Sequence, residues 1–287
     1  MGDIRQRRDQ RPRKPTPMQL TERDKQVIEA VHLYRVLRQD QIQALFFGAS
    51  KAAQRRLIRL YHHGFLERLF LPVVAGRSPT FYVLDRKGAE LLRSELGYDE
   101  LHWYNSSKDL KTDFLEHTIA INDFRIAVTH AAQQEGYRLV IWKSESDLKA
   151  SYDRVAVRVP SGKAHNYPIV PDSYFVIETP LGRAHFFIEV DRGTETTDRF
   201  KSKIRAYTAY YETGGYEKRF QTKSLRVLTI AIGEKRLLNL KKATEDVNGR
   251  RRYWFALASD LTLETVLAAP VWQIAGETTR RPLIETV

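Results

Sequence analysis

The chain has no cysteine in its 287 residues. Disulfides and zinc sites built from cysteine thiolates are therefore excluded, and a reducing compartment fits this composition. No apolar run approaches the roughly 20 residues that a membrane helix requires, and residues 1–17 lack the apolar core of a signal peptide. We therefore expect an intracellular, cytoplasmic protein that does not enter a membrane.

Several catalytic motifs are also missing. The stretch "PSGKAHN" contains Gly162 and Lys163, but no glycine lies five residues before Gly162, so the sequence does not support a phosphate-cradling P-loop. The chain has neither the paired histidines around one apolar residue that a tyrosine relaxase needs nor a G-x-S-x-G motif. Nucleotide hydrolysis, relaxase chemistry and this type of serine catalysis are not predicted.

The charge that is present is basic and unevenly distributed. The net charge is +12; residues 1–97 hold 19 Lys and Arg against 10 Asp and Glu, and the remaining residues hold 28 against 25. This asymmetry indicates a polyanionic partner, most simply nucleic acid. A basic tail kept for solubility is the alternative, but residues 1–17 hold only six basic and two acidic residues and explain part of the excess.

Three short helices are predicted after this tail. Thr21 can cap the first helix, with Asp24 at the third position, and a second segment places Ile42 and Leu45 on one stripe before Gly48. Ser50 is expected to cap the third, "SKAAQRRLIRLYHHG". Two strand-like runs, 65–72 and 79–85, and a helix capped by Asp85 complete a winged-helix pattern.

The third helix has a basic outer face that suits the major groove of double-stranded DNA. The expected groove contacts are Lys51, Gln54, Arg55 and Arg59, and the expected phosphate contacts are Arg56 and, at the tip of the wing, Arg77. A solvated helix face, or a winged helix that binds protein, would have the same pattern.

A second set of elements follows in the order helix, three strands, helix, strand. A long helix runs from Thr112, strands are predicted over 137–145, 166–179 and 183–193, a helix is capped by Thr197, and a strand covers 224–233. The predicted organisation is a disordered basic tail (1–17), a winged-helix domain (18–97), a linker (98–111) and an α/β domain (112–287).

Paired carboxylates end a hydrophobic strand of this second domain. Because strand side chains alternate, Glu189 and Asp191 point the same way. Asp172 precedes the turn between two strands, so pairing across the hairpin can bring all three acids together. Such acids can hold Mg²⁺, act as acid and base, or lie on a solvated strand end.

The sequence here resembles two known groups of proteins. Asp172 in "PD" and Glu189 in "EVD", separated by a hairpin, resemble the PD-(D/E)xK nuclease superfamily, whose core has this element order. The winged helix followed by "FFIEVDRGTE" and "KIRAYTAYY" resembles the replication-relaxation protein family of bacterial plasmids and integrative elements. The resemblance implies an α/β (α+β) fold: a winged helix-turn-helix and a restriction-endonuclease-like domain with a mixed central sheet.

The resemblance also implies roles for particular residues. Asp172 and Glu189 match the acids that hold Mg²⁺ or Mn²⁺, and Asp191, the third acid of the expected metal group, stands where the superfamily has its lysine. Lys203 is the favoured replacement and Lys201 the other. Glu116 on the long helix matches a helical acid used near the metal by some of these nucleases. Arg192 and Glu195 are expected to support the site or bind phosphate.

Two functions are consistent with these features. The first is a DNA-binding protein with a Mg²⁺-dependent endonuclease activity in plasmid or mobile-element replication. The alternative is a non-catalytic transcriptional or copy-number regulator whose nuclease-like domain mediates dimerisation or partner contact. Double-stranded DNA is the expected partner in both, together with a second copy of the chain or replication and mobile-element proteins.

Overall fold

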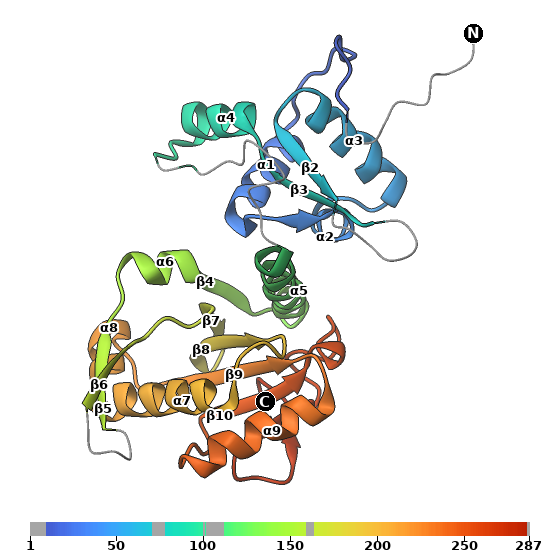
Figure 1. The fold of residues 1–287 in the computed structure, drawn as a ribbon. Coiled ribbons are helices and arrows are strands. Elements are labelled where there is room, and N and C mark those ends of the chain that lie inside the picture. The colour runs from blue at the N-terminus through green and yellow to red at the C-terminus, as the bar shows by residue number, and fades with distance from the viewer. Residues whose placement is uncertain (1–9, 71–77, 100, 102–111, 159–163, 286–287) are drawn as a thin grey trace. The chain divides into compact units, whose positions relative to one another are not determined.

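The computed structural model describes residues 10–70, 78–99, 101, 112–158 and 164–285 (Figure 1). Contacts divide the chain into two compact units, Met1–Asp123 (unit 1) and Phe124–Val287 (unit 2). No helix in the described ranges is both long and apolar enough to cross a membrane.

Unit 1 contains the predicted three helices, β-hairpin and further helix. Its elements are α1 (Glu22–Tyr34), β1 (Leu37–Arg38), α2 (Gln39–Phe46), α3 (Ser50–His62), β2 (Leu66–Phe70), β3 (Thr80–Leu84) and α4 (Arg86–Leu96). The sequence analysis did not predict β1, which pairs antiparallel with β3 and makes a three-stranded sheet in the order β1-β3-β2.

Local signals explain where these helices begin and which face they bury. The predicted capping box of α1 is present: Thr21 accepts a hydrogen bond from the Asp24 N–H, and the Asp24 carboxylate accepts one from the Thr21 N–H. The N-cap of α3 is Ala49 and not Ser50, which is already the first helical residue. Leu57 and Leu60 of α3 are fully buried, so its polar face is left outward.

The boundary between the units lies inside helix α5 (Thr112–Gln134), later than the expected start of the second domain at Thr112. Leu115 and Ile119 of α5 pack in one buried cluster with Val36 and Phe81 of unit 1. Asn122 donates hydrogen bonds to the carbonyl of Val36 at 2.6 Å and to that of Tyr34. The sequence pattern could not show that one continuous helix contributes buried residues to both units.

Three residues of the expected tail, Arg11, Thr16 and Pro17, contact other parts of unit 1, and the disorder of the tail stays a prediction. Arg11 forms ion pairs with Glu67 at 2.9 Å and with Asp85, and its guanidinium lies 4.7 Å from the ring centre of Tyr61. In the expected linker, Tyr98 donates a hydrogen bond to Glu29 at 2.8 Å and Leu101 is buried.

Unit 2 is built on a seven-stranded mixed sheet in the order β12-β11-β10-β9-β8-β7-β4. Its strands are β4 (Arg138–Ser144), β7 (Ser173–Thr179), β8 (Gly182–Asp191), β9 (Arg226–Ala231), β10 (Tyr253–Leu257), β11 (Trp272–Ile274) and β12 (Arg280–Arg281). A separate hairpin consists of β5 (Arg154–Arg158) and β6 (Ala164–Pro168). The helices that follow α5 are α6 (Glu145–Ala150), α7 (Thr197–Glu212), α8 (Gly215–Phe220) and α9 (Glu234–Asp246).

The predicted order of helix, three strands, helix and strand is present as α5, β4, β7, β8, α7 and β9. Strands β4, β7 and β8 are antiparallel neighbours, and β8 runs parallel to β9. The single strand predicted over 166–179 is in fact two, β6 and β7, and these belong to different sheets. Helix α9 was not predicted.

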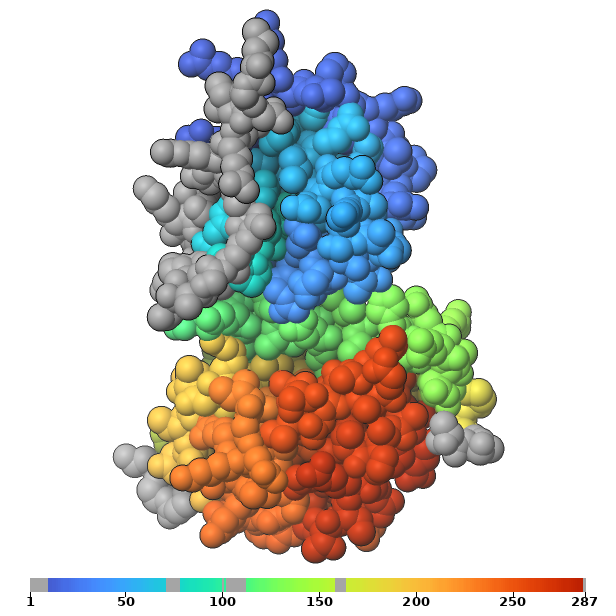
Figure 2. Space-filling model, turned by 90° about the vertical axis from the view of Figure 1, so that its right-hand side faces the viewer, coloured from blue at the N-terminus to red at the C-terminus, as the bar shows by residue number. Residues whose placement is uncertain are grey.

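The two faces of this sheet are covered by different helices (Figure 1). Helices α7 and α9 lie on one face, where Phe187, Phe200 and Tyr207 share a buried cluster with Leu240. On the other face Phe124 of α5 makes edge contacts with Phe175 and Trp272. Residues drawn in orange and red, which include α9 and the C-terminal segment, form much of the surface of unit 2 in Figure 2. The central strands β7, β8, β9 and β10 are mostly buried, whereas the edge strands β4 and β12 are more exposed.

Candidate active site

Asp172 and Glu189 lie opposite each other at one end of the β7–β8 pair. Ser173 is the register partner of Ile188, and the Asp172 N–H donates to the Ile188 carbonyl at 3.0 Å. The Val190 N–H donates to Asp172 Oδ2 at 2.7 Å, which fixes this carboxylate against the β8 backbone. The hairpin therefore brings two of the predicted acids together.

Helix α7 supplies two groups to Glu189. Lys203 Nζ donates to Glu189 Oε2 at 2.7 Å, and the Tyr207 hydroxyl donates to Oε1. Four residues separate Lys203 from Tyr207, so both lie on the same face of α7. Lys201 instead pairs with Asp246 of α9 at 2.8 Å. Of the two candidate lysines, Lys203 is the one that reaches the acids.

The buried position of Glu189 changes its ionisation. Its side chain is only 4% exposed. Burial raises the pKa of Glu189 to about 7; the ammonium of Lys203 opposes this rise and the carboxylate of Asp172 adds to it. Burial lowers the pKa of Lys203, but Glu189 and Asp172 outweigh this and raise it above the ordinary value. Lys203 is thus held as a cation beside a carboxyl group that can exchange its proton near neutral pH.

Asp191 does not join the other two acids, and this corrects the predicted group of three. Arg236 of α9 forms a bidentate ion pair with it, with Nε at 2.8 Å from Oδ1 and Nη2 at 2.6 Å from Oδ2. The Gly193 N–H also donates to Oδ1 at 2.8 Å. Among the described residues, no three His, Cys, Asp or Glu side chains are grouped so that they could hold a metal ion. A cation site here would rest on Asp172 and Glu189.

Two further acids were predicted to act near the metal or to support the site. Glu195 lies 3.3 Å from Lys203 Nζ, and its backbone carbonyl accepts a hydrogen bond from Arg236 at 2.6 Å. Glu195 therefore links the loop after β8 to both α7 and α9. Glu116 is an exposed residue in the part of α5 that belongs to unit 1, and its role stays a prediction.

Two residues of this site were not predicted from the sequence to have a functional role. Tyr207 lies on the buried side of α7, where a sequence pattern indicates packing, although a buried tyrosine hydroxyl usually finds a polar partner. Arg236 lies in α9, whose spacing of Leu237 and Leu240 is typical of an amphipathic helix and was the available signal. No local pattern could have paired Arg236 with Asp191, because 45 residues separate them.

The predicted DNA contacts of unit 1 divide into four groups, of which Arg56 forms the last. Lys51, Gln54 and Arg55 are exposed on α3, as expected for groove contacts. Arg59 is partly buried and donates to the Pro17 carbonyl at 2.6 Å. Arg77 lies outside the described residues.

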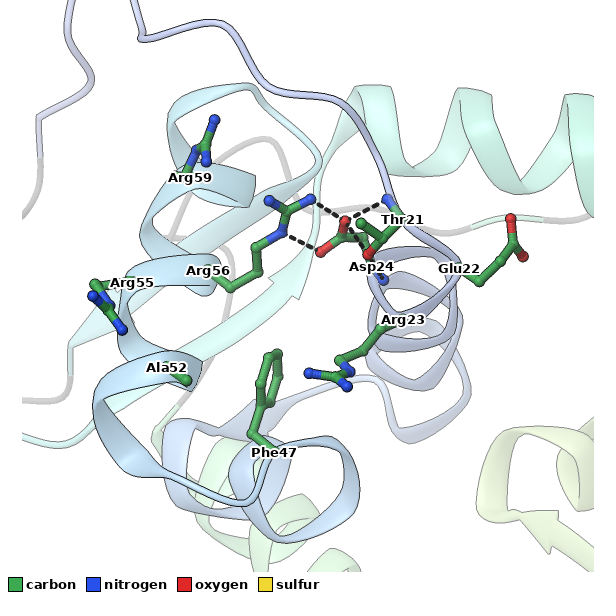
Figure 3. A pocket seen from close by; sticks show the side chains of 9 residues that line it. All are labelled: Thr21, Glu22, Arg23, Asp24, Phe47, Ala52, Arg55, Arg56 and Arg59. Atoms are coloured by element: carbon green, nitrogen blue, oxygen red, sulfur yellow. Dashed lines mark hydrogen bonds and ion pairs between the residues drawn. The ribbon is translucent and has the colours of Figure 1, made fainter.

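Arg56 does not have the predicted position. Its guanidinium pairs with the Asp24 carboxylate, with Nε at 2.6 Å from Oδ1 (Figure 3). It also donates to the Gln19 carbonyl at 2.8 Å. Burial would raise the pKa of Asp24, but hydrogen bonds from Arg56 and Thr21 lower it below its ordinary value. Arg56 therefore ties α3 to the start of α1, and it cannot at the same time be a free phosphate contact.

The fold and this site define a two-unit α/β protein in which two carboxylates at one end of the β7–β8 pair lie next to a lysine. The family model named replication-relaxation matches residues 28–224, and the chain belongs to this family. The match spans most of unit 1 and, in unit 2, the strands and helix that carry Asp172, Glu189 and Lys203.

Comparison with other proteins adds little to this assignment. No curated protein matches the chain. Among solved structures, the restriction endonuclease FokI is similar at 13% sequence identity with a TM-score of 0.29, over 85% of this chain. The match covers 43% of the FokI chain, so this protein corresponds to less than half of that structure.

Proposed function

We propose that the protein binds double-stranded DNA through unit 1 and hydrolyses a phosphodiester at the site of Asp172, Glu189 and Lys203 in unit 2. The observation that carries the proposal is the contact of Lys203 Nζ with Glu189 at 2.7 Å, directly across from Asp172. The replacement lysine thus comes from α7 and lies beside the acid pair. Arg236 holds Asp191, which stands where the resemblance expects a strand lysine.

The two carboxylates suit a hard divalent cation. Mg²⁺ prefers oxygen ligands and keeps several of its waters, so Asp172 and Glu189 together can supply what it needs from the protein. Each oxygen of Glu189 accepts one hydrogen bond, from Lys203 or from Tyr207, and keeps a second lone pair that can face a cation. When bound, Mg²⁺ or Mn²⁺ would activate water and polarise the phosphate.

The chain's own residues then have separate tasks. Lys203 has three N–H donors, so beside its bond to Glu189 it can orient the attacking water or stabilise charge on the phosphoryl oxygens. The bond from Tyr207 to the other oxygen fixes the orientation of Glu189. The Asp191–Arg236 pair holds the strand end and the loop that follows it, on which Glu195 faces Lys203.

A nicking assay with supercoiled plasmid and Mg²⁺ or Mn²⁺ tests the proposal. The wild type is expected to cut, and Lys203→Met is expected to lose about 100-fold or more of the rate because a charge-stabilising donor is removed. Lys201→Met is the matched control: its lysine is similarly exposed on the same helix but pairs with Asp246. Equal losses in both variants, or cutting that survives Asp172→Asn, would refute this assignment.

A second candidate is the non-catalytic regulator, in which unit 2 serves as a binding platform. The observation that favours it is that the buried Glu189 side chain is hydrogen-bonded by both Lys203 and Tyr207. Such a network can hold the sheet end together without any chemistry. DNA retention by a wild type that does not cut in either metal would select this candidate.

The raised pKa of Glu189 predicts a pH dependence of stability. The folded protein holds the proton up to about pH 7, whereas the unfolded chain releases it near the ordinary glutamate value. The contribution of this group to stability is therefore present at low pH and is lost as pH rises through the interval between the two values. Measured by denaturant unfolding, wild type should lose stability relative to Glu189→Gln between about pH 5 and about pH 8. A difference between the two proteins that does not change with pH would contradict this.

A further inference from the structure

A hollow on the surface of unit 1 lies between the first turn of α1 and helix α3 (Figure 3). Its volume is about 790 Å³. Arg23 lines it from α1, Arg55 and Arg59 line it from α3, and Phe47, which follows α2, contributes an aromatic ring. The hollow is therefore bordered by basic side chains from two helices that are far apart in sequence.

Positive charge in this hollow is not balanced by the nearby acids. Asp24 is taken by Arg56, and Glu22 lies 3.2 Å from Lys25. Within the described parts of the chain, neither Arg23 nor Arg55 has a carboxylate partner. Arg59 Nε is buried and has no hydrogen-bond partner among the described atoms. Three guanidinium groups thus border one concave surface without a neutralising carboxylate, a composition that attracts an anion.

The Arg23 side chain is oriented so that it can bind such an anion. Its guanidinium lies 5.4 Å from the ring centre of Phe47, and Figure 3 shows it directed across the hollow toward α3. Stacking on an aromatic ring restricts the side chain and leaves the N–H donors at the edge of the guanidinium available. The Asp24 N–H in the first turn of α1 is bonded to the Thr21 hydroxyl, so the side chains, and not the helix end, define the site.

We propose that this hollow binds one phosphodiester of the DNA backbone and that Arg23, outside the groove-facing helix, contacts that phosphate. The inference rests on the proposed DNA binding by unit 1 and deepens it. With Lys51, Gln54 and Arg55 in the groove, the adjacent sugar-phosphate strand passes beside α3, and arginine matches a phosphate with two parallel hydrogen bonds. Arg23 then takes the role that the sequence analysis gave to Arg56.

The test measures the affinity of full-length wild type and Arg23→Gln for a duplex oligonucleotide at a series of salt concentrations. Loss of one phosphate contact should reduce the slope of log affinity against log salt by about 1 and weaken binding about three- to tenfold at moderate salt. Arg93→Gln is the control, because Arg93 is equally exposed on α4, which does not line the hollow. Arg23 is exposed, so its variant should keep the wild-type melting temperature.

The outcomes separate the inference from the function on which it rests. A wild type that does not bind the duplex removes the proposed DNA binding and the inference together. Normal wild-type binding with an unchanged slope in Arg23→Gln overturns the inference alone. In a second arm, inorganic phosphate is titrated without DNA. Saturable phosphate binding that is lost in Arg23→Gln, together with an unchanged salt slope for the duplex, would assign the hollow to the free anion instead.

Discussion

Arg56→Met is expected to destabilise unit 1 by about 3 kcal/mol, because it leaves a buried carboxylate without its counter-charge. The Asp24 side chain is 1% exposed and that of Arg56 is 21% exposed, so water can replace little of the lost interaction. Asp24 also belongs to the capping box of α1, and Arg56 anchors the chain before α1 through the Gln19 carbonyl. The loss therefore affects both the start of α1 and its attachment to α3.

The neighbouring residue provides a matched control for this prediction. Arg55→Met removes the same charge from the same helix, but Arg55 is exposed and should change stability by less than about 0.5 kcal/mol. DNA affinity should show the reverse order, since Arg55 is the predicted groove contact. Amide hydrogen exchange in α1 and α3 measures the stability of this region directly. Equal protection in the two variants would show that the Arg56–Asp24 pair is not a structural contact.

Arg236→Met is expected to destabilise unit 2 by about 3 to 5 kcal/mol. The Asp191 side chain is 4% exposed and loses both guanidinium hydrogen bonds in this variant, which leaves an uncompensated charge at the end of a central strand. The Glu195 carbonyl loses its hydrogen bond from the same guanidinium. We therefore expect the loop after β8 to loosen, and Lys203 to become less well placed.

Arg199→Met is the control for this second prediction. Its side chain is 82% exposed and lies 3.4 Å from the Glu195 carboxylate, so it belongs to the same neighbourhood without a buried partner. Hydrogen exchange of β8 and α9 amides should show a large loss of protection for Arg236→Met and almost none for Arg199→Met. Similar protection in both would mean that Asp191 is stabilised by other groups, among which the Gly193 N–H is already identified.

Elements with strong local signals were predictable from the sequence. The capping box at Thr21 and Asp24 marked the start of α1, and the alternation along residues 183–193 predicted the face of β8 that carries Glu189. The prediction of a single strand over 166–179 was wrong, because pairing partners from different sheets, and not local pattern, divide β6 from β7.

Contacts between residues that are distant in the sequence were harder to predict from the sequence. The prediction of Lys203 depended on the family motif, in which a lysine precedes a tyrosine, and the structure places its ammonium at Glu189. Arg56 and Asp191 were misassigned for one shared reason. Each was given a functional role from its position in the sequence. Each in fact belongs to an ion pair between a buried aspartate and an arginine, which only the tertiary fold brings into contact.

The central claim is that Asp172 and Glu189 form one divalent-cation site next to Lys203. Binding of Mn²⁺, followed by electron paramagnetic resonance at near-neutral pH, tests it most directly, since free and bound ions are counted without any need for cleavage. The account predicts saturable binding of a single Mn²⁺ by wild type that is lost in Asp172→Asn and Glu189→Gln and retained in Lys201→Met. A wild type that binds no Mn²⁺, or binding that persists in both carboxylate variants, would contradict it.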